Sequence, residues 1–302
     1  MSARRCSTFK LTTMHKILVT GGNGQLGQAI IKAAQGSNNE YITLSRSEAD
    51  ICNYEMMDNL LSVQHFNIVI NCAAYTNVDG AEDNIDEAQR INGEGVATLA
   101  QVCKRHNARL IHISTDYVFG GDEQHTTPYT EYDTPYPINN YGRTKLAGEQ
   151  VALKLSNAII IRTAWLYSPW GKNFVRTILR LARELGKLRV INDQRGTPTS
   201  ALSLARTLVS LIDSGKIDGM SGIYHYTNRG ETSWYDFAQR IVELANVECT
   251  IEPCSTAERP SKASRPRYSV LDCQRISQIC GTITEWQEAL AECIELINKD
   301  DE

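Results

Sequence analysis

One stretch near the start of the chain combines a β-rich run, a glycine turn and a helical pattern, in that order. Residues His15–Thr20 (HKILVT) lead into a G-x-x-G-x-x-G turn, and the pattern of Gln28–Gln35 is helical. Gly21 allows a tight turn, Gly24 lets the backbone approach a pyrophosphate, and Gly27 lets the helix pack closely on the strand. The amides at the helix N-terminus favour an anion. The stretch therefore predicts a nucleotide-binding α/β fold.

Further strands and helices alternate along the first half of the chain. Runs that are mostly apolar are typical of buried parallel strands. Strands are expected at Tyr41–Leu44, Ile68–Ala74, Leu110–Ser114 and Ala158–Arg162, and a helix is expected over Glu87–His106. We therefore predict an α/β fold, a Rossmann-type doubly wound parallel sheet with a smaller C-terminal substrate-binding lobe.

The end of the second strand is where such folds read the ribose of a dinucleotide. Here that position holds Ser45 and Arg46 in place of an acidic residue. A serine and an arginine can receive a 2′-phosphate, whereas a carboxylate would repel it. NADPH is therefore the predicted cofactor, with NADH as the alternative. Asp50 and Ile51 are expected at the adenine.

Small and polar residues follow the next two strands. Ala73 and Ala74 would let a cofactor lie across the strand tip, and Tyr75 and Thr76 would continue along it. On the substrate side we place four residues, Val78, Thr115, Asp116 and Tyr117. His112 lies within a predicted strand, where a core histidine with satisfied hydrogen bonds is the expected role.

Tyr141 and Lys145 lie one helical turn apart in a segment that continues as a helix. A free tyrosine, with a pKa near ~10, is a poor proton donor at neutral pH, and a fixed ammonium lowers that value. Tyr141 is therefore a candidate general acid. An exposed helical pair would show the same spacing.

Two loops are candidates for contacts with substrate. The polar run Tyr117–Asn140 is long enough to be functional, and we expect it to cover the active site. The loop Ala257–Tyr268 carries four cations within nine residues, among which Arg265 is expected to reach a diphosphate or to shape its pocket. A solvated basic loop is the alternative.

Composition narrows the partners and the compartment. The net charge of −4 argues against a general nucleic-acid binder, and no apolar run approaches the about 18 residues that span a bilayer. The nine cysteines never form a C-x-x-C pair. Reduced thiols in a cytoplasm fit this pattern.

The expected domain organisation follows from these patterns. Residues 1–13 lack the apolar core of a signal peptide and are expected to be a disordered extension. Residues 14–164 form the predicted NAD(P)-binding domain, whose sheet continues in part to about residue 227. Residues 165–302 are mostly the substrate-binding lobe, with interleaved segments. Within the second half, Thr199 is expected to cap the helix Ser200–Ile212, and Ser233 the helix that ends at Leu244.

Four motifs together resemble the extended short-chain dehydrogenases/reductases. They are Thr20–Gly27, Asn71–Thr76, Ser114–Phe119 and Tyr141–Lys145. Three further motifs, Arg162–Tyr167, Asn192–Thr199 and Ser264–Pro266, narrow the resemblance to the dTDP-4-dehydrorhamnose reductase family, over about residues 15–298.

The resemblance implies a catalytic triad of Thr115, Tyr141 and Lys145. Hydride would pass from a nicotinamide to C4 of a 4-keto-6-deoxyhexose carried on dTDP, while Tyr141 protonates the alkoxide. Lys145 would lower the pKa of Tyr141 and hold the nicotinamide ribose, and Thr115 would bond the keto oxygen or Tyr141. The remaining matches imply cofactor contacts at Gln25, Leu26, Ala73, Ala74 and Thr76, and sugar contacts at Asp116 and Trp165.

The resemblance also implies a bound Mg²⁺ and a homodimer. Its metal ligands are unknown, and the carboxylates to inspect are Glu288, Glu292 and Glu295. Family members often carry an acidic residue near Ser45, and its absence here favours NADPH.

Two other functions stay open from the sequence. One is an NADP-binding regulatory subunit, because the β subunit of methionine adenosyltransferase resembles the same family. The other is a nucleotide-sugar epimerase or dehydratase. Dehydratases that resemble this group carry an acidic pair after the strand-end threonine, whereas Asp116 is followed here by Tyr117.

Overall fold

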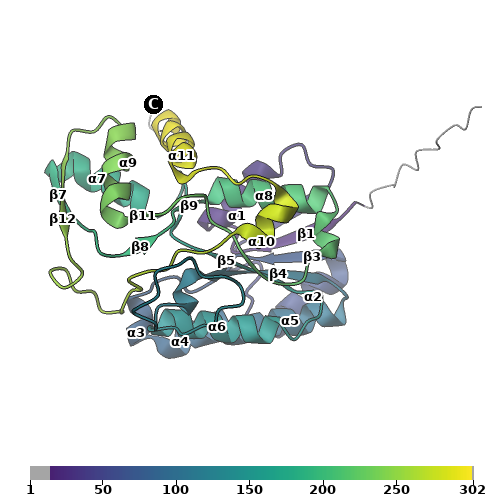
Figure 1. Ribbon diagram of the computed structural model, residues 1–302. Helices are drawn as coiled ribbons and strands as arrows, with labels where there is room; N and C mark the ends of the chain where they lie inside the picture. The colour runs from purple at the N-terminus through teal and green to yellow at the C-terminus, as the bar shows by residue number, and fades with distance from the viewer. Residues whose placement is uncertain (1–13, 301–302) are drawn as a thin grey trace, which may run out of the picture.

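The computed structural model describes residues 14–300 and contains a six-stranded, fully parallel sheet with helices on both faces (Figure 1). The strand order is β10-β5-β4-β3-β1-β2. The strands are β1 (Lys16–Thr20), β2 (Glu40–Leu44), β3 (Ile68–Asn71), β4 (Arg109–Thr115), β5 (Ile159–Thr163) and β10 (Gly222–His225). This is the predicted Rossmann-like fold. The order changes direction between β1 and β3, and ligands bind at such switch points.

Two layers of helices cover the sheet. One layer contains α1 (Gln25–Ala33), α8 (Ala201–Asp213) and α10 (Gln274–Cys280), and the other contains α2 (Tyr54–Gln64), α5 (Gly95–Arg105) and α6 (Asn140–Ala152). The strands present apolar residues to both layers, so Ile68, Val69 and Ile70 are all buried. Because α8 and β10 come from the second half of the chain, the two halves interleave.

The predicted helix Glu87–His106 contains a π-helical turn. The observed helix consists of α4 (Ile85–Gln89), the π-helical turn Arg90–Glu94 and α5. A Cβ added to Gly148 of α6 would lie 2.1 Å from the carbonyl oxygen of Asn92. The π-helical turn and Gly148 therefore allow the backbone of Arg90–Glu94 to contact the backbone of α6.

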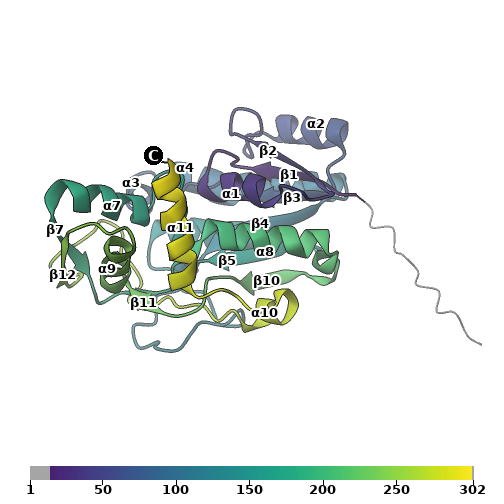
Figure 2. The same cartoon turned by 90° about the horizontal axis from the view of Figure 1, so that it is seen from above.

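A smaller unit, called here the C-terminal lobe, stands beyond the carboxyl ends of the sheet strands (Figures 1 and 2). It has its own apolar core, which includes Phe237 and Trp286. Its elements are α7 (Phe174–Leu185), β7 (Lys187–Ile191), α9 (Trp234–Leu244), β12 (Thr250–Cys254) and α11 (Trp286–Asp300). As expected, Ser233 caps α9, because its Oγ accepts a hydrogen bond from the Asp236 amide (3.1 Å).

Two local expectations were wrong by a few residues. Ser200, not Thr199, is the N-cap of α8, because the helix begins at Ala201, directly after β9 (Thr199–Ser200), which pairs with β6 (Leu166–Tyr167). β3 ends at Asn71 and not at Ala74, since Asn71 Oδ1 accepts a hydrogen bond from the Ala73 amide at 3.2 Å. The predicted extension 1–13 lies outside the described residues. No helix in the described part of the chain has the length and apolar character needed to cross a membrane.

Candidate active site

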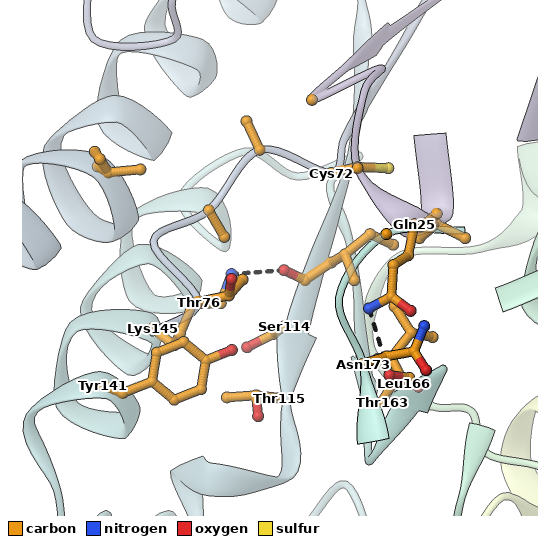
Figure 3. A pocket seen from close by; sticks show the side chains of 18 of the residues that line it. Gln25, Cys72, Thr76, Ser114, Thr115, Tyr141, Lys145, Thr163, Leu166 and Asn173 are labelled. Atoms are coloured by element: carbon orange, nitrogen blue, oxygen red, sulfur yellow. Dashed lines mark hydrogen bonds between the residues drawn. The ribbon is translucent and has the colours of Figure 1, made fainter. Parts of the chain in front are cut away.

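A cavity of about 750 Å³ opens at the carboxyl ends of β1, β3 and β4 and extends to the C-terminal lobe (Figure 3). Most of the residues predicted from sequence line it: Gly21, Gly24, Gln25, Leu26, Ser45, Arg46, Asp50, Ile51, Ala73, Ala74, Thr76, Val78, Thr115, Asp116, Tyr117, Tyr141, Lys145 and Trp165. Three predicted residues, Gly27, Tyr75 and Arg265, are not part of the lining. The sequence motifs therefore converge on one cavity.

The glycine turn at one end of the cavity cannot accommodate side chains at two of its positions. Gly21 has a φ of +68°, and a Cβ there would lie 2.8 Å from the Ala73 amide nitrogen. A Cβ at Gly27 would lie 2.7 Å from the Gly21 carbonyl oxygen. The turn leaves the N-terminus of α1 facing the cavity, and this geometry suits a pyrophosphate.

Asn92 holds the predicted cofactor loop in place, although the sequence analysis did not select it. Its Oδ1 accepts a hydrogen bond from the Tyr75 amide (2.9 Å), and its Nδ2 donates to the Tyr75 carbonyl and to Thr144 Oγ1 (both 3.1 Å). Tyr75 therefore anchors the loop to α6 through its backbone. An asparagine on the buried side of a helix, next to Gly93, was the available signal.

Tyr141 and Lys145 both lie at the cavity end of α6. Asn139 caps this helix, since its Oδ1 accepts a hydrogen bond from the Gly142 amide (2.7 Å). Figure 3 shows the Tyr141 ring directed toward the hydroxyls of Ser114 and Thr115. The sequence had predicted Thr115, but not Ser114.

The structure does not show the expected lowering of the Tyr141 pKa by Lys145. Burial of the ring raises the pKa of Tyr141 to about 12. A hydrogen bond from Thr115 lowers this pKa in part, and the charge of Asp116 raises it further. Lys145 is buried, and its Nζ donates to the Ile113 carbonyl at 2.7 Å. Burial lowers the pKa of Lys145 to about 8, although Glu149 and Cys72 oppose this change. The amine of Lys145 is therefore turned toward the sheet, and it loses its proton more readily than a free lysine does.

Asp116 is a buried carboxylate beside the triad. Its Oδ1 accepts a hydrogen bond from Thr115 Oγ1 (3.1 Å). Burial raises the pKa of Asp116 to about 6, despite hydrogen bonds from Ser269 and Thr115. Its charge at neutral pH is therefore a cost to folding.

We expect Asp116→Asn to stabilise the protein at pH 7 but not at pH 4. The Asp116 carboxyl ionises in the unfolded chain near pH 4 and in the folded protein near pH 6, so wild-type stability falls between these values. The variant avoids this loss, which is at most about 3 kcal/mol. Urea denaturation at both pH values measures the difference. Asp218→Asn, at an exposed carboxylate, is the control. An equal gain for Asp116→Asn at both pH values would contradict the assignment.

A carboxylate that the sequence did not point to is bonded to Ser45, a residue of the cavity lining, but is not itself part of that lining. Glu48 Oε2 accepts hydrogen bonds from the Ser45 amide (2.9 Å) and from Ser45 Oγ (2.6 Å). Arg46 is exposed and lies 3.6 Å from Asp50 and 3.7 Å from Glu87. A carboxylate is thus absent at position 45 but is bonded to that residue from three positions later in the chain.

Trp165 forms the wall of the cavity toward the lobe in an uncommon backbone conformation, with a φ of +47°. Its ring stacks on Trp234 with centroids 3.5 Å apart, and a Cβ at Gly196 would lie 2.5 Å from it. Trp234 also lines the cavity, and no local sequence pattern had predicted this. The two indoles therefore form an aromatic part of the cavity lining.

Arg265 lies outside the lining and pairs with an acidic residue. Its guanidinium donates to Asp79 at 2.7 Å, and Lys262 in the same loop pairs with Asp83. Arg265 also lies near Tyr117, which does line the cavity, and its charge opposes the rise that burial causes in the pKa of Tyr117. Asp79 and Asp83 therefore compensate part of the basic charge of this loop, and Arg265 acts on the cavity from outside its lining.

The loop Tyr117–Asn140 does not cover the cavity, contrary to expectation. None of residues 118–140 lines it. The loop instead packs along β10 and a later segment: the Tyr129 amide donates to the Val270 carbonyl (2.8 Å), and the His225 amide donates to Glu131 (3.0 Å). These pairings between distant segments were not visible in the local sequence.

The carboxylates considered for magnesium do not form a cation site. Within residues 14–300, no group of three or more His, Cys, Asp or Glu side chains could hold a metal ion. Glu292 is paired with Arg206 across α11 and α8. We therefore assign no role to a metal.

The cavity combines a glycine turn, which fits a pyrophosphate, with a Tyr–Lys pair. Together these two features define the class of the protein. The protein is a Rossmann-type, dinucleotide-dependent oxidoreductase of the short-chain dehydrogenase/reductase kind. The chain belongs to the family described as RmlD substrate binding domain, whose model matches residues 14–298.

Relatives of known name and structure agree with this family. The chain is 38% identical to a dTDP-4-dehydrorhamnose reductase of Aggregatibacter actinomycetemcomitans, covering 92% of this chain and 97% of that protein. It is also 38% identical to the spore coat polysaccharide biosynthesis protein SpsK of Bacillus subtilis (93% and 98%). The crystal structure of a Bacillus anthracis dTDP-4-dehydrorhamnose reductase in complex with NADP is 35% identical, with a TM-score of 0.88, covering 94% of this chain and 99% of that one.

Proposed function

We propose that the protein reduces the C4 keto group of dTDP-4-dehydro-β-L-rhamnose to give dTDP-L-rhamnose, with NADPH as reductant, for cell-surface polysaccharide synthesis. The observation that carries the proposal is the convergence of Thr115, Tyr141 and Lys145 on the cavity that also holds the glycine turn. The names of the relatives supply the substrate.

Different residues of the cavity would have different roles in the reaction. Bound NADPH supplies the hydride. Tyr141 keeps its proton at neutral pH, since its pKa is raised to about 12, and can give it to a developing C4 alkoxide, which is more basic. The hydroxyl of Thr115, which donates to Asp116 Oδ1 in the structure, would turn to donate either to Tyr141 or to the substrate oxygen. Lys145, which lines the same cavity, would hold the nicotinamide ribose.

The substrate side of the cavity is formed by a small set of residues. We assign the sugar to Val78, Asp116, Tyr117 and Trp165, and Trp234 stacks on Trp165 in the same lining. Arg265 would then shape the substrate pocket through its effect on Tyr117, which is the indirect form of its predicted role.

We expect Ser45→Asp to shift the cofactor preference from NADPH toward NADH. The new carboxylate would face a 2′-phosphate, and the hydrogen bond from Ser45 Oγ to Glu48 would be lost. Hydrogen bonds to charged groups contribute about 1.5–3 kcal/mol, so the wild-type preference should be about ten- to a hundredfold. Catalytic efficiencies with NADPH and NADH measure it.

Glu48→Gln is the matched variant, and it should shift the cofactor preference in the direction opposite to that of Ser45→Asp. It removes a carboxylate from the same site and keeps the shape of the side chain, so the preference for NADPH should increase. Equal efficiencies with both cofactors in the wild type would count against the assignment of Ser45 and Arg46.

Oxidation of NADPH, followed spectrophotometrically with and without dTDP-4-dehydro-β-L-rhamnose, tests the proposed function. Substrate-dependent oxidation is expected. Binding of NADPH without turnover would favour a regulatory subunit, and conversion of the sugar without net oxidation would favour an epimerase or dehydratase. A homodimer and a cytoplasmic location stay predictions that sedimentation and fractionation can test.

A further inference from the structure

Four buried polar residues form a continuous series behind the cavity. Thr20 of β1, Asn71 of β3 and His112 of β4 are each 0% exposed, and Lys145 of α6 is 2% exposed. The series crosses three neighbouring strands of the sheet and ends at the amine of Lys145. Polar groups buried to this degree must satisfy one another, so their hydrogen-bond directions can be deduced.

The orientation of the Asn71 amide is fixed by two donors. Its Oδ1 accepts from Thr20 Oγ1 (2.7 Å) and from the Ala73 backbone amide (3.2 Å). The backbone N–H can only donate, so the atom that faces it must be the oxygen. The Asn71 Nδ2 group is therefore directed at His112.

The Asn71 amide in turn fixes the tautomer of His112. Its Nδ2 lies 3.0 Å from His112 Nδ1, and an amide NH₂ can only donate, so Nδ1 must accept. Burial, and to a smaller extent Lys145, lowers the pKa of His112, so the ring is neutral. A neutral ring that accepts at Nδ1 carries its proton on Nε2.

That Nε2–H faces Lys145. The two nitrogens are 3.4 Å apart, while Nζ donates to the Ile113 carbonyl at 2.7 Å. An ammonium has no lone pair with which to accept the Nε2–H, whereas a neutral amine does. Two further groups act on Lys145, the Glu149 carboxylate and, less strongly, Cys72. Both favour the ammonium, so they oppose the effects of burial and of the ring N–H.

We propose that Asn71 and His112 are positioning residues for Lys145: the amide sets the ring tautomer, and the ring N–H disfavours the ammonium and directs Nζ to the Ile113 carbonyl. The inference rests on the proposed function, in which Lys145 holds the nicotinamide ribose. The charge of Lys145 is then set from within the sheet, by residues that touch neither cofactor nor substrate. The same chain sets the upper pH limit for NADPH binding.

The tautomer itself can be read directly. In protein labelled with ¹⁵N-histidine, His112 should show the Nε2–H tautomer across neutral pH, with assignment by the resonances missing from His112→Phe. An Nδ1–H tautomer, or a ring that protonates near neutral pH, would overturn the proposal. This measurement is made on the wild-type protein and needs no turnover.

The effect on Lys145 is measured by a double-mutant cycle. Asn71→Asp keeps the shape but makes both side-chain oxygens acceptors, so Nδ1 takes the proton and Nε2 presents a lone pair to Lys145. The Lys145 pKa, followed by ¹³C NMR of ε-labelled lysine and assigned with Lys145→Arg, should rise by about one unit or more, which is a tenfold change in proton affinity.

The His112→Phe background separates this effect from that of the added charge. If the ring transmits the change, Asn71→Asp should alter the Lys145 pKa much less in that background. Equal shifts in both backgrounds would show that only the charge acts and would overturn the proposal.

The pH dependence of NADPH binding adds a readout linked to function. The alkaline loss of NADPH affinity should move to higher pH in Asn71→Asp, in step with the Lys145 pKa. An unmoved alkaline limit would contradict the proposal. Failure of the proposed reduction would leave the NMR results unchanged, so the two failures can be told apart.

Discussion

Tyr141→Phe should lower the rate of keto-sugar reduction about 10²- to 10⁴-fold, which corresponds to about 3–5 kcal/mol of activation free energy. The variant keeps the ring that packs edge-on against Tyr117, with centroids 5.8 Å apart, and removes only the proton donor. NADPH affinity should therefore change little. Single-turnover reduction rates and NADPH fluorescence titration measure the two quantities separately.

Tyr132→Phe is the matched control, because the same hydroxyl is removed from a ring that is 84% exposed on the loop outside the cavity. It should behave as wild type. If Tyr141→Phe retained most of the wild-type rate, Tyr141 would not be the general acid.

Glu149→Ala should destabilise the protein by about 3–5 kcal/mol, the second large effect. Arg162 and Glu149 are each 1% exposed and form a buried ion pair, with Arg162 Nη2 2.7 Å and Nε 2.9 Å from the carboxylate oxygens. Ser114 Oγ donates to the same carboxylate (2.5 Å). Removal of Glu149 leaves a guanidinium buried without its partner. Urea denaturation gives the loss in the free energy of unfolding.

Two comparisons show whether this loss comes from the buried charge. Glu184→Ala breaks the exposed i,i+4 pair with Arg180, and should cost only about 0.3–0.5 kcal/mol. The double variant Glu149→Leu/Arg162→Met removes both charges and should be more stable than Glu149→Ala alone. A loss for Glu149→Ala no larger than that for Glu184→Ala would refute the burial argument.

Features encoded by local pattern were predictable from the sequence. The apolar runs at Ile68 and Ala158 marked buried strands, since parallel strands covered on both faces need them. The glycine spacing marked the turn because Gly21 must adopt a positive φ. Motifs at strand ends also located most of the cavity lining, because the carboxyl ends of parallel strands meet at one edge of the sheet.

Features that depend on pairing between distant segments were not predictable in this way. Trp234 reaches the cavity only because the C-terminal lobe stacks it on Trp165. Arg265 has the partner Asp79, 186 residues away, so its charge is not free in the way the loop composition suggested. Lys145 was expected to act on the Tyr141 phenol, but its Nζ donates to the carbonyl of Ile113 in β4, a partner that the local sequence did not indicate.

Hydride transfer to C4 is the central claim, and isotope transfer tests it most directly. The protein would be incubated with dTDP-4-dehydro-β-L-rhamnose and NADPH deuterated at the transferable position of the nicotinamide, and the product examined by NMR. We predict dTDP-L-rhamnose with a single deuterium at C4, formed by the wild type and not at a comparable rate by Tyr141→Phe. A sugar product without deuterium at C4, or no product while NADPH remains bound, would contradict the account.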